Sequence, residues 1–330
     1  MRLIGIFAAV LLSACAREGS GPARLLVAAP MSGAMSAEGK GLERAVRLAV
    51  EDEAASGSTP AVEVVVTDDK ADPFAAADAA RRAIDDPAIF AVIGHMTSGC
   101  ALEASRVYAH APLAMITPSA TAPELTLQQG RPDWSGERVV FRLPPPDTVQ
   151  AEAAADYAVK RLSLRRFVLV HDGTPYGLGL VTALREALKR KGGRALGLVA
   201  LERGGKDFSV IVKTILTHRP EAVFFGGLSL EAGLLIKQAR TAGYRGVYMS
   251  GDGAKSPEFF EAAGAASHGA YITVDGVPVE ALPSASDFIE RYQKRWDGAA
   301  PRAFDHYGYE AARVALSAMR KVGTDRKKVL

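Results

Sequence analysis

Two short segments of this sequence carry hydroxyl groups and free backbone N–H groups that could bind an anion. Residues 94–99, GHMTSG, lead into an expected helix that Ser98 would cap, and the N–H groups behind a cap attract negative charge. Residues 117–124, TPSATAPE, are bounded by prolines and offer backbone donors together with the side-chain oxygens of Ser119 and Thr121. Each segment alone is equally well explained as a turn or a helix cap.

A third segment, residues 250–253 with the sequence SGDG, places Asp252 between two glycines at the end of an expected strand. Donors for an anion in one part of the chain and an acid in another suit a zwitterionic ligand. Asp68 and Asp69 are a weaker candidate pair of acids, because adjacent residues of a strand point to opposite faces and cannot readily share one proton. For these two we expect a role in a turn or a cap.

Motifs for bond-making chemistry are missing from the sequence. It contains no P-loop, no Gly-x-Ser-x-Gly elbow and no His-Glu-x-x-His zinc motif. Gly177 and Gly179 form only half of a dinucleotide fingerprint and predict a tight turn into a helix. Cys100 has no histidine directly beside it in sequence, which favours a buried packing residue over a nucleophile. We expect no enzyme activity, cofactor or metal.

Strand-type and helix-type segments alternate along most of the chain. Apolar runs such as 62–66 and 167–171 alternate with helical patterns such as 41–55, which is typical of parallel sheets covered by helices. The alternation restarts after a junction near 140–147, and a second junction is expected near 274–280. The sequence therefore predicts an α/β protein with two lobes, each a three-layer sandwich, whose loops at the carboxyl ends of the strands would hold a ligand.

The amino-acid composition argues against some classes of binding partner. The 330 residues carry 40 Lys and Arg against 37 Asp and Glu, a net charge of +3. So small an excess argues against nucleic-acid binding, which requires a concentrated basic surface. The two cysteines and six scattered histidines offer little material for a metal site.

The first residues have the pattern of an export signal. Arg2 precedes an apolar run, residues 3–12, that is too short to span a bilayer. The ending Leu-Ser-Ala-Cys resembles a bacterial lipobox, which predicts a signal peptide over 1–14 and a lipidated Cys15. A flexible tether over 15–23 would follow. The alternative is an ordinary signal peptide with a cysteine at this position by chance.

Runs of residues in both expected lobes resemble the leucine and branched-chain amino-acid binding proteins of bacterial ABC transporters, which have the type I periplasmic binding fold. The resemblance covers residues 24–320. The similar runs in the first lobe are residues 25–33, 67–73, 92–95 and 115–125, and those in the second are 170–172, 176–177, 206–209, 225–227 and 238–240.

The resemblance implies roles for particular residues. Ser98 and the segment Ser119, Ala120 and Thr121 would hold the α-carboxylate of an amino acid, with Ser119 also contributing to its amino group. Asp252 would bind the α-ammonium. Tyr176 would line the second lobe, and Phe304 would lie near the pocket for the ligand side chain.

The chain also departs from the family pattern. Leu228 stands where leucine-type members carry a tyrosine that assists the ammonium, and Glu38 stands where they carry an aromatic wall of the side-chain pocket. A polar or basic ligand side chain becomes a candidate, with a solvated Glu38 at the rim as the alternative. Ala71 and Thr97 replace the two cysteines of a family disulfide.

Together these features predict a monomeric, lipid-anchored solute-binding protein in the periplasm or cell envelope that delivers an amino acid, of the branched-chain type or related, to an ABC permease. The first lobe is expected to comprise residues 24–142 and 277–330, and the second residues 143–276. Family members continue for some tens of residues beyond the position of Leu330, so we expect either a truncated end or a looser hinge between the lobes. The alternative function is a sensor or regulatory lipoprotein on the same fold that binds an amide or small carboxylate.

Overall fold

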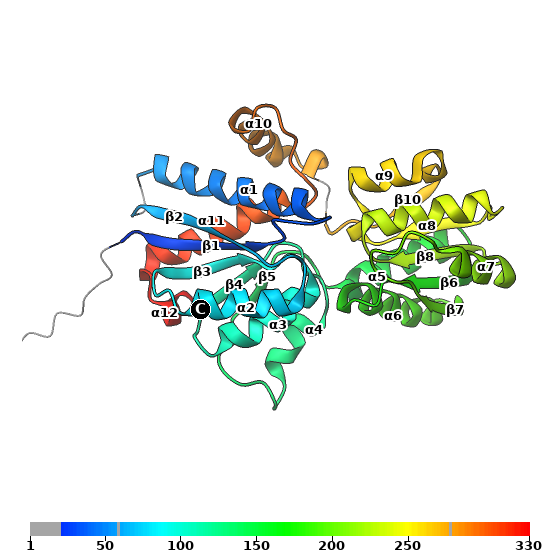
Figure 1. Ribbon diagram of the computed structural model, residues 1–330, viewed down its shortest axis with the longest axis horizontal. Helices are drawn as coiled ribbons and strands as arrows, with labels where there is room; N and C mark the ends of the chain where they lie inside the picture. The colour runs from blue at the N-terminus through cyan, green and yellow to red at the C-terminus, as the bar shows by residue number, and fades with distance from the viewer. Residues whose placement is uncertain (1–20, 58–59, 277–278) are drawn as a thin grey trace, which may run out of the picture.

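Parallel β-sheets form the centres of two lobes that lie side by side in the computed structural model, which describes residues 21–57, 60–276 and 279–330 (Figure 1). The first sheet has the strand order β2-β1-β3-β4-β5. All its strand pairs are parallel. Its strands are β1 (Ala23–Ala29), β2 (Val62–Asp68), β3 (Ile89–Gly94), β4 (Ala114–Thr117) and β5 (Val140–Arg142).

The second sheet has the order β10-β9-β8-β6-β7 and is also parallel throughout. Its strands are β6 (Arg166–His171), β7 (Arg194–Ala200), β8 (Ala222–Gly226), β9 (Val247–Ser250) and β10 (Ala270–Ile272). The central strand β8 is buried along its whole length, because helices cover both of its faces.

Helices cover both faces of the first sheet. Helices α1 (Ser36–Ala55) and α11 (Asp305–Val322) share a hydrophobic core with one face, to which α10 (Ser286–Arg295) also contributes. Helices α2 (Pro73–Ile84) and α3 (Ser98–Ala109) pack on the opposite face. The segment from α10 to the short C-terminal α12 (Arg326–Val329) therefore returns to the first lobe.

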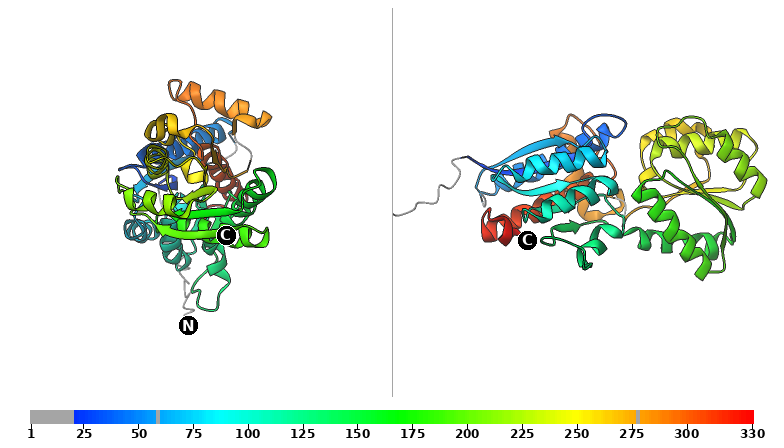
Figure 2. Two further views of the ribbon diagram at one scale, coloured as in Figure 1. Left: turned by 90° about the vertical axis from the view of Figure 1, so that its right-hand side faces the viewer. Right: turned by 60° about the horizontal axis from the view of Figure 1, so that its bottom comes forward.

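The second lobe repeats this arrangement. Helices α5 (Asp147–Asp156) and α6 (Pro175–Arg190) pack on one face of its sheet. Helices α7 (Ser209–His218), α8 (Ser229–Thr241) and α9 (Pro257–Ala263) pack on the other. The right-hand view of Figure 2 shows the two sandwiches next to each other along the length of the molecule. The predicted α/β fold with a parallel-sheet sandwich in each lobe is confirmed.

The carboxyl ends of the two sheets face each other. Arg203, in the loop after β7, donates a hydrogen bond across the lobes to the carbonyl of Ala71, in the loop after β2, at 3.4 Å. The chain passes between the lobes after β5 and again after β10. Loops that follow parallel strands thus meet between the lobes, where ligands of open α/β sheets bind.

The structure describes the N-terminal part of the chain from residue 21 onward. Strand β1 begins at Ala23, inside the segment 15–23 predicted as a tether. Cys15 and the predicted signal over 1–14 lie outside the described residues. Within the described part of the chain, none of the helices combines the length and the apolar character required to cross a bilayer.

Candidate functional site

Asp252 lies at the carboxyl end of β9 and is fixed by two side chains of the second lobe. Its Oδ1 accepts hydrogen bonds from Gln150 Nε2 of α5 at 2.7 Å and from Tyr176 Oη of α6 at 2.8 Å. Gln150 Oε1 in turn accepts from the backbone N–H of Asp252 at 2.9 Å. Because the side chain is only 5% exposed, these bonds hold a buried carboxylate in one orientation.

Two further acids complete what we call the acid cluster, Asp147, Asp252 and Asp275. Asp147 is the first residue of α5, directly after the first passage between the lobes, and Asp275 lies on the second passage. Gln150 Nε2 is 3.4 Å from Asp147 Oδ1 and 3.5 Å from Asp275 Oδ1. One amide group has two hydrogens, so it cannot bond well to all three carboxyls.

Burial sets the charge of the acid cluster. Burial and the nearby charge of Asp252 raise the pKa of Asp147 to about 8. Burial and the same neighbour raise the pKa of Asp275 to about 9, and burial also raises the pKa of Asp252. Near neutral pH the cluster therefore keeps protons that exposed aspartates would have lost, and its net negative charge is small.

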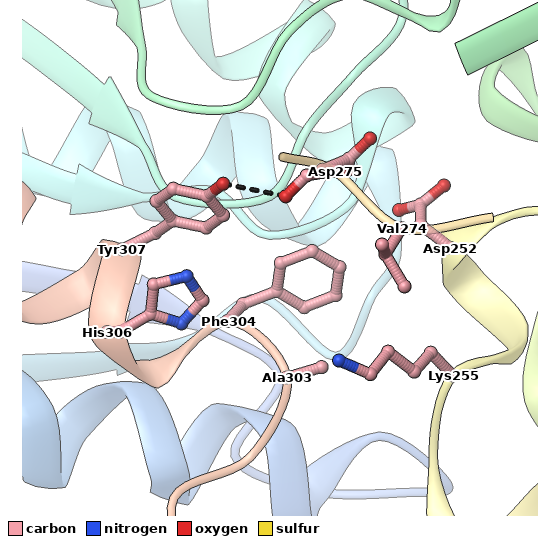
Figure 3. A pocket seen from close by; sticks show the side chains of 8 residues that line it. All are labelled: Asp252, Lys255, Val274, Asp275, Ala303, Phe304, His306 and Tyr307. Carbon is pink, nitrogen blue, oxygen red and sulfur yellow. Dashed lines mark hydrogen bonds between the residues drawn. The ribbon is translucent and has the colours of Figure 1, made fainter. Parts of the chain in front are cut away.

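A pocket between the lobes has two members of the acid cluster, Asp252 and Asp275, on one side (Figure 3). It contains about 290 Å³ of empty space, part of it open to solvent. From the second lobe and the passage that follows it come Asp252, Lys255 and Asp275, and from the first lobe Phe304 and Tyr307. Tyr307 Oη donates to the backbone carbonyl of Asp275 at 2.7 Å, which ties the start of α11 to the second passage.

Glycines on both sides of Asp252 allow this close packing. A Cβ atom at Gly251 would lie 2.5 Å from Tyr176 Oη, and one at Gly253 would lie 2.9 Å from the carbonyl of Gly227. Tyr176 itself is 8% exposed and accepts a hydrogen bond from the N–H of Gly253 at 3.0 Å. The contacts of Tyr176 thus hold the Asp252 loop in place.

The two predicted donor segments lie together in the first lobe. Ser98 Oγ accepts from the N–H of Ala122 at 3.2 Å, and Ser119 Oγ donates to the carbonyl of Met96 at 2.8 Å. The expectation that Ser98 caps α3 is wrong, since Thr97 occupies the N-cap position and accepts from the N–H of Cys100. Ser98 is the first residue of the helix, which leaves its hydroxyl free to join the neighbouring loop.

Thr121 connects these donors to the acid cluster. Its carbonyl accepts from the N–H of Asp147 at 2.9 Å, and both Ala120 and Thr121 are buried. Neither Ser98 nor Ser119 is among the residues that line the pocket of Figure 3, whereas Asp252 and Phe304 are. The structure thus places Asp252 and Phe304 in one pocket, whereas Ser98 and Ser119 do not line it.

Glu38 is part of an ionic contact between the lobes. Arg302 Nη2 lies 2.6 Å from Glu38 of the first lobe and 2.7 and 2.8 Å from the two carboxylate oxygens of Glu258 on α9. We call these three residues the inter-lobe bridge. Its arginine is already paired with Glu38, a contact that the sequence did not reveal. Leu228, the other departure from the family pattern, precedes α8.

Other candidates from the sequence have structural roles. Asp68 accepts hydrogen bonds from Met31 N–H, Ser32 Oγ and Lys70 N–H, which confirms its expected role in a turn. Cys100 is fully buried, and burial raises the pKa of its thiol to about 12, as expected for a packing residue. The residues that the structure describes contain no cluster of His, Cys, Asp or Glu suited to a metal ion.

Two parallel-sheet lobes, two passages between them and a polar pocket at their junction define the class of two-lobe ligand-binding proteins. The model of the periplasmic binding protein family matches residues 22–330, so the chain belongs to that family.

Known relatives include an amino acid binding protein of Pseudomonas aeruginosa, which is 32% identical over 91% of this chain and 78% of its own length. A leucine binding protein of Thermotoga maritima has a TM-score of 0.84 and 30% identity, over 93% of this chain and 85% of that one. A branched-chain amino acid transporter substrate binding protein of Streptococcus pneumoniae, solved with isoleucine, has a TM-score of 0.83 at 24% identity, over 94% and 86% of the chains. The similarity to the Streptococcus protein shows a shared fold.

Proposed function

We propose that this protein is a substrate-binding protein that captures an amino acid between its lobes and delivers it to an ABC importer. The observation that carries the proposal is Asp252, a buried carboxylate held by Gln150 and Tyr176 at the edge of the inter-lobe pocket. A ligand ammonium would supply the positive charge that such a group lacks. The names of the Pseudomonas and Thermotoga relatives support an amino-acid ligand.

In this proposal the ligand bridges the two lobes. Its ammonium would contact Asp252 of the second lobe, and its α-carboxylate would contact Ser98, Ser119, Ala120 and Thr121 of the first. The N-terminus of α3 would add a favourable dipole for the carboxylate. Since each lobe holds one end of the ligand, binding would favour the closed state by the difference in affinity between the two states. The protein would act as a monomer that presents its closed form to the permease.

Calorimetric titration of the wild type and of Asp252→Asn tests the proposal. The asparagine keeps the oxygen that accepts from Gln150 and Tyr176 but loses the charge, so affinity should fall roughly ten- to a thousandfold. The exposed Asp133→Asn is the matched control and should bind as the wild type does. Ser98→Ala should cost less affinity than Asp252→Asn, because neighbouring backbone donors remain. Equal affinities, or a best ligand without an amino group, would favour the sensor function.

We also propose that the mature protein begins at a lipidated Cys15. The lipobox-like ending at residues 12–15 supports this part of the proposal. Several acyl chains would anchor the protein firmly, since each buried CH₂ contributes about 0.8 kcal/mol. Intact-mass measurement of the membrane-extracted protein should give a chain that starts at residue 15 and carries diacylglyceryl mass. A product cleaved at another position would contradict the anchor without affecting the ligand proposal.

A further inference from the structure

Lys255 has no partner for its charge in the part of the chain that the structure describes. Its backbone N–H donates to the carbonyl of Asp252 at 2.8 Å, but no hydrogen bond or ion pair of the described residues engages its ammonium. The side chain lines the inter-lobe pocket, and its Nζ points toward Ala303 (Figure 3). A cation that faces a partly enclosed pocket without a counter-ion favours an anionic ligand group there.

The acids around the pocket do not compensate the positive charge of Lys255. Glu38 and Glu258 both contact Arg302 in the inter-lobe bridge. Asp252 accepts from Gln150 and Tyr176 and, in the proposed function, binds the ligand ammonium. Burial raises the pKa values of Asp147 and Asp275 to about 8 and about 9, so these acids keep their protons near neutral pH. Once an ammonium has neutralised Asp252, the charge left without compensation in the pocket is that of Lys255.

The direction of the lysine side chain indicates which part of the ligand it would meet. In Figure 3 the carboxylates lie on one side of the pocket, and Lys255 extends along another toward Ala303, with Phe304 between them. Phe304 is the residue expected at the side-chain end of the ligand, whereas the expected carboxylate donors belong to the loops around Ser98 and Thr121. Lys255 is therefore placed to meet the ligand side chain.

We propose that Lys255 binds a carboxylate on the ligand side chain and makes acidic amino acids the preferred substrate class. This inference rests on the proposed function and deepens it. It also replaces the expectation of a basic side chain, which depended on Glu38 being free. Glu38 is paired with Arg302 and does not line the pocket, so the charged side chain that faces the pocket at this end is Lys255.

Calorimetric titration with isosteric pairs tests the proposal. The wild type should bind glutamate more tightly than glutamine, or aspartate more tightly than asparagine, by roughly ten- to a hundredfold, as for a charge-assisted hydrogen bond. Lys255→Met keeps the length of the side chain without its charge and should abolish this preference, leaving glutamine affinity within about threefold of the wild type. Lys255→Arg should retain the preference. Lys213→Met, on the exposed face of α7, is the control and should change nothing.

Two results would overturn the inference. One is a wild type that binds the neutral member of each pair as tightly as the acidic member. The other is an equal loss for glutamate and glutamine in Lys255→Met, which would assign Lys255 to the α-carboxylate. The proposed function fails separately, if no amino acid binds but glutarate does. In that case a loss of glutarate affinity in Lys255→Met would still support a carboxylate site at Lys255.

Discussion

His95 Nδ1 lies 2.7 Å from Asp69 Oδ2 in the interior of the first lobe, where neither side chain is exposed. The other ring nitrogen of His95 lies 3.1 Å from the hydroxyl of Tyr108 on α3. Asp69 follows β2 and His95 follows β3, so the pair joins the loops at the carboxyl ends of the two strands that flank β1. These loops also contain Ala71 and Thr97, and the Asp69–His95 contact links the two loops without a covalent bond.

Removal of one member of this pair should destabilise the first lobe. His95→Leu leaves the Asp69 carboxylate buried without its partner, and such a loss costs about 3–5 kcal/mol. Urea denaturation should report this decrease in the free energy of unfolding. The double variant Asp69→Leu/His95→Leu should lose less than the sum of the single variants, because it leaves no unpaired charge. A cost below about 1 kcal/mol for His95→Leu would contradict a structural role.

The sequence predicted the lobes and part of the site. The alternation of strand and helix patterns predicted the parallel sheets, because the strands of such sheets bury both faces under helices and are therefore apolar. Asp252 was found because it lies between glycines at a strand end. Gln150 and Asp275 were not found, since Gln150 is separated from Asp252 by 102 residues and from Asp275 by 125. Such partners become visible only when the two passages bring α5 and the end of β10 together.

Arg302 should stabilise the closed arrangement of the lobes. Arg302→Gln removes the cation between Glu38 and Glu258, whose carboxylates then repel each other across the junction. Because the bridge is only partly buried, we expect ligand affinity to fall by roughly three- to tenfold. Small-angle X-ray scattering of the ligand-saturated variant should give a larger radius of gyration than the wild type. Arg313→Gln, which breaks the exposed Arg313–Glu310 pair on α11, is the control and should leave both quantities unchanged.

The acid cluster should make stability fall as pH rises. Asp147 has an ordinary pKa of 3.8 when unfolded and a pKa of about 8 when folded. The folded state therefore binds more protons between these values, and its stabilising contribution is complete below about pH 4 and is lost as pH rises through about 8. Asp275 extends this window to about 9.

Asp147→Asn should reduce this dependence, since asparagine resembles the protonated acid at every pH. The free energy of unfolding of the wild type, minus that of the variant, should decrease between pH 5.5 and 8.5. The limiting slope is about 1.4 kcal/mol per pH unit for one proton. Denaturation across this range measures the difference, with Asp133→Asn as the exposed control. Parallel pH profiles for Asp147→Asn and the wild type would show that Asp147 ionises in the folded protein as it does in the unfolded chain.

Gly251→Ala should displace Tyr176 from Asp252 through steric contact alone. Gly251 has a φ of −79°, which alanine adopts without strain, but its Cβ would lie 2.5 Å from both Tyr176 Oη and Leu180 Cδ2. Overpacking of this kind costs about 1–3 kcal/mol, and loss of the Tyr176 hydrogen bond should also weaken ligand binding.

The double variant Gly251→Ala/Tyr176→Phe separates this contact from a general loss of folding. Phenylalanine lacks the Oη atom that the new methyl group would meet, so the double variant should be more stable than the sum of the two single changes predicts. Gly179→Ala in α6 is the matched control, because its Cβ would meet no atom within 4 Å and alanine favours the helix by about 0.5–1 kcal/mol. If the loss of thermal stability in the double variant equals the sum of the losses in the two single variants, the methyl group does not act through Tyr176. A favourable coupling would show that the orientation of Asp252 depends on the space left by Gly251.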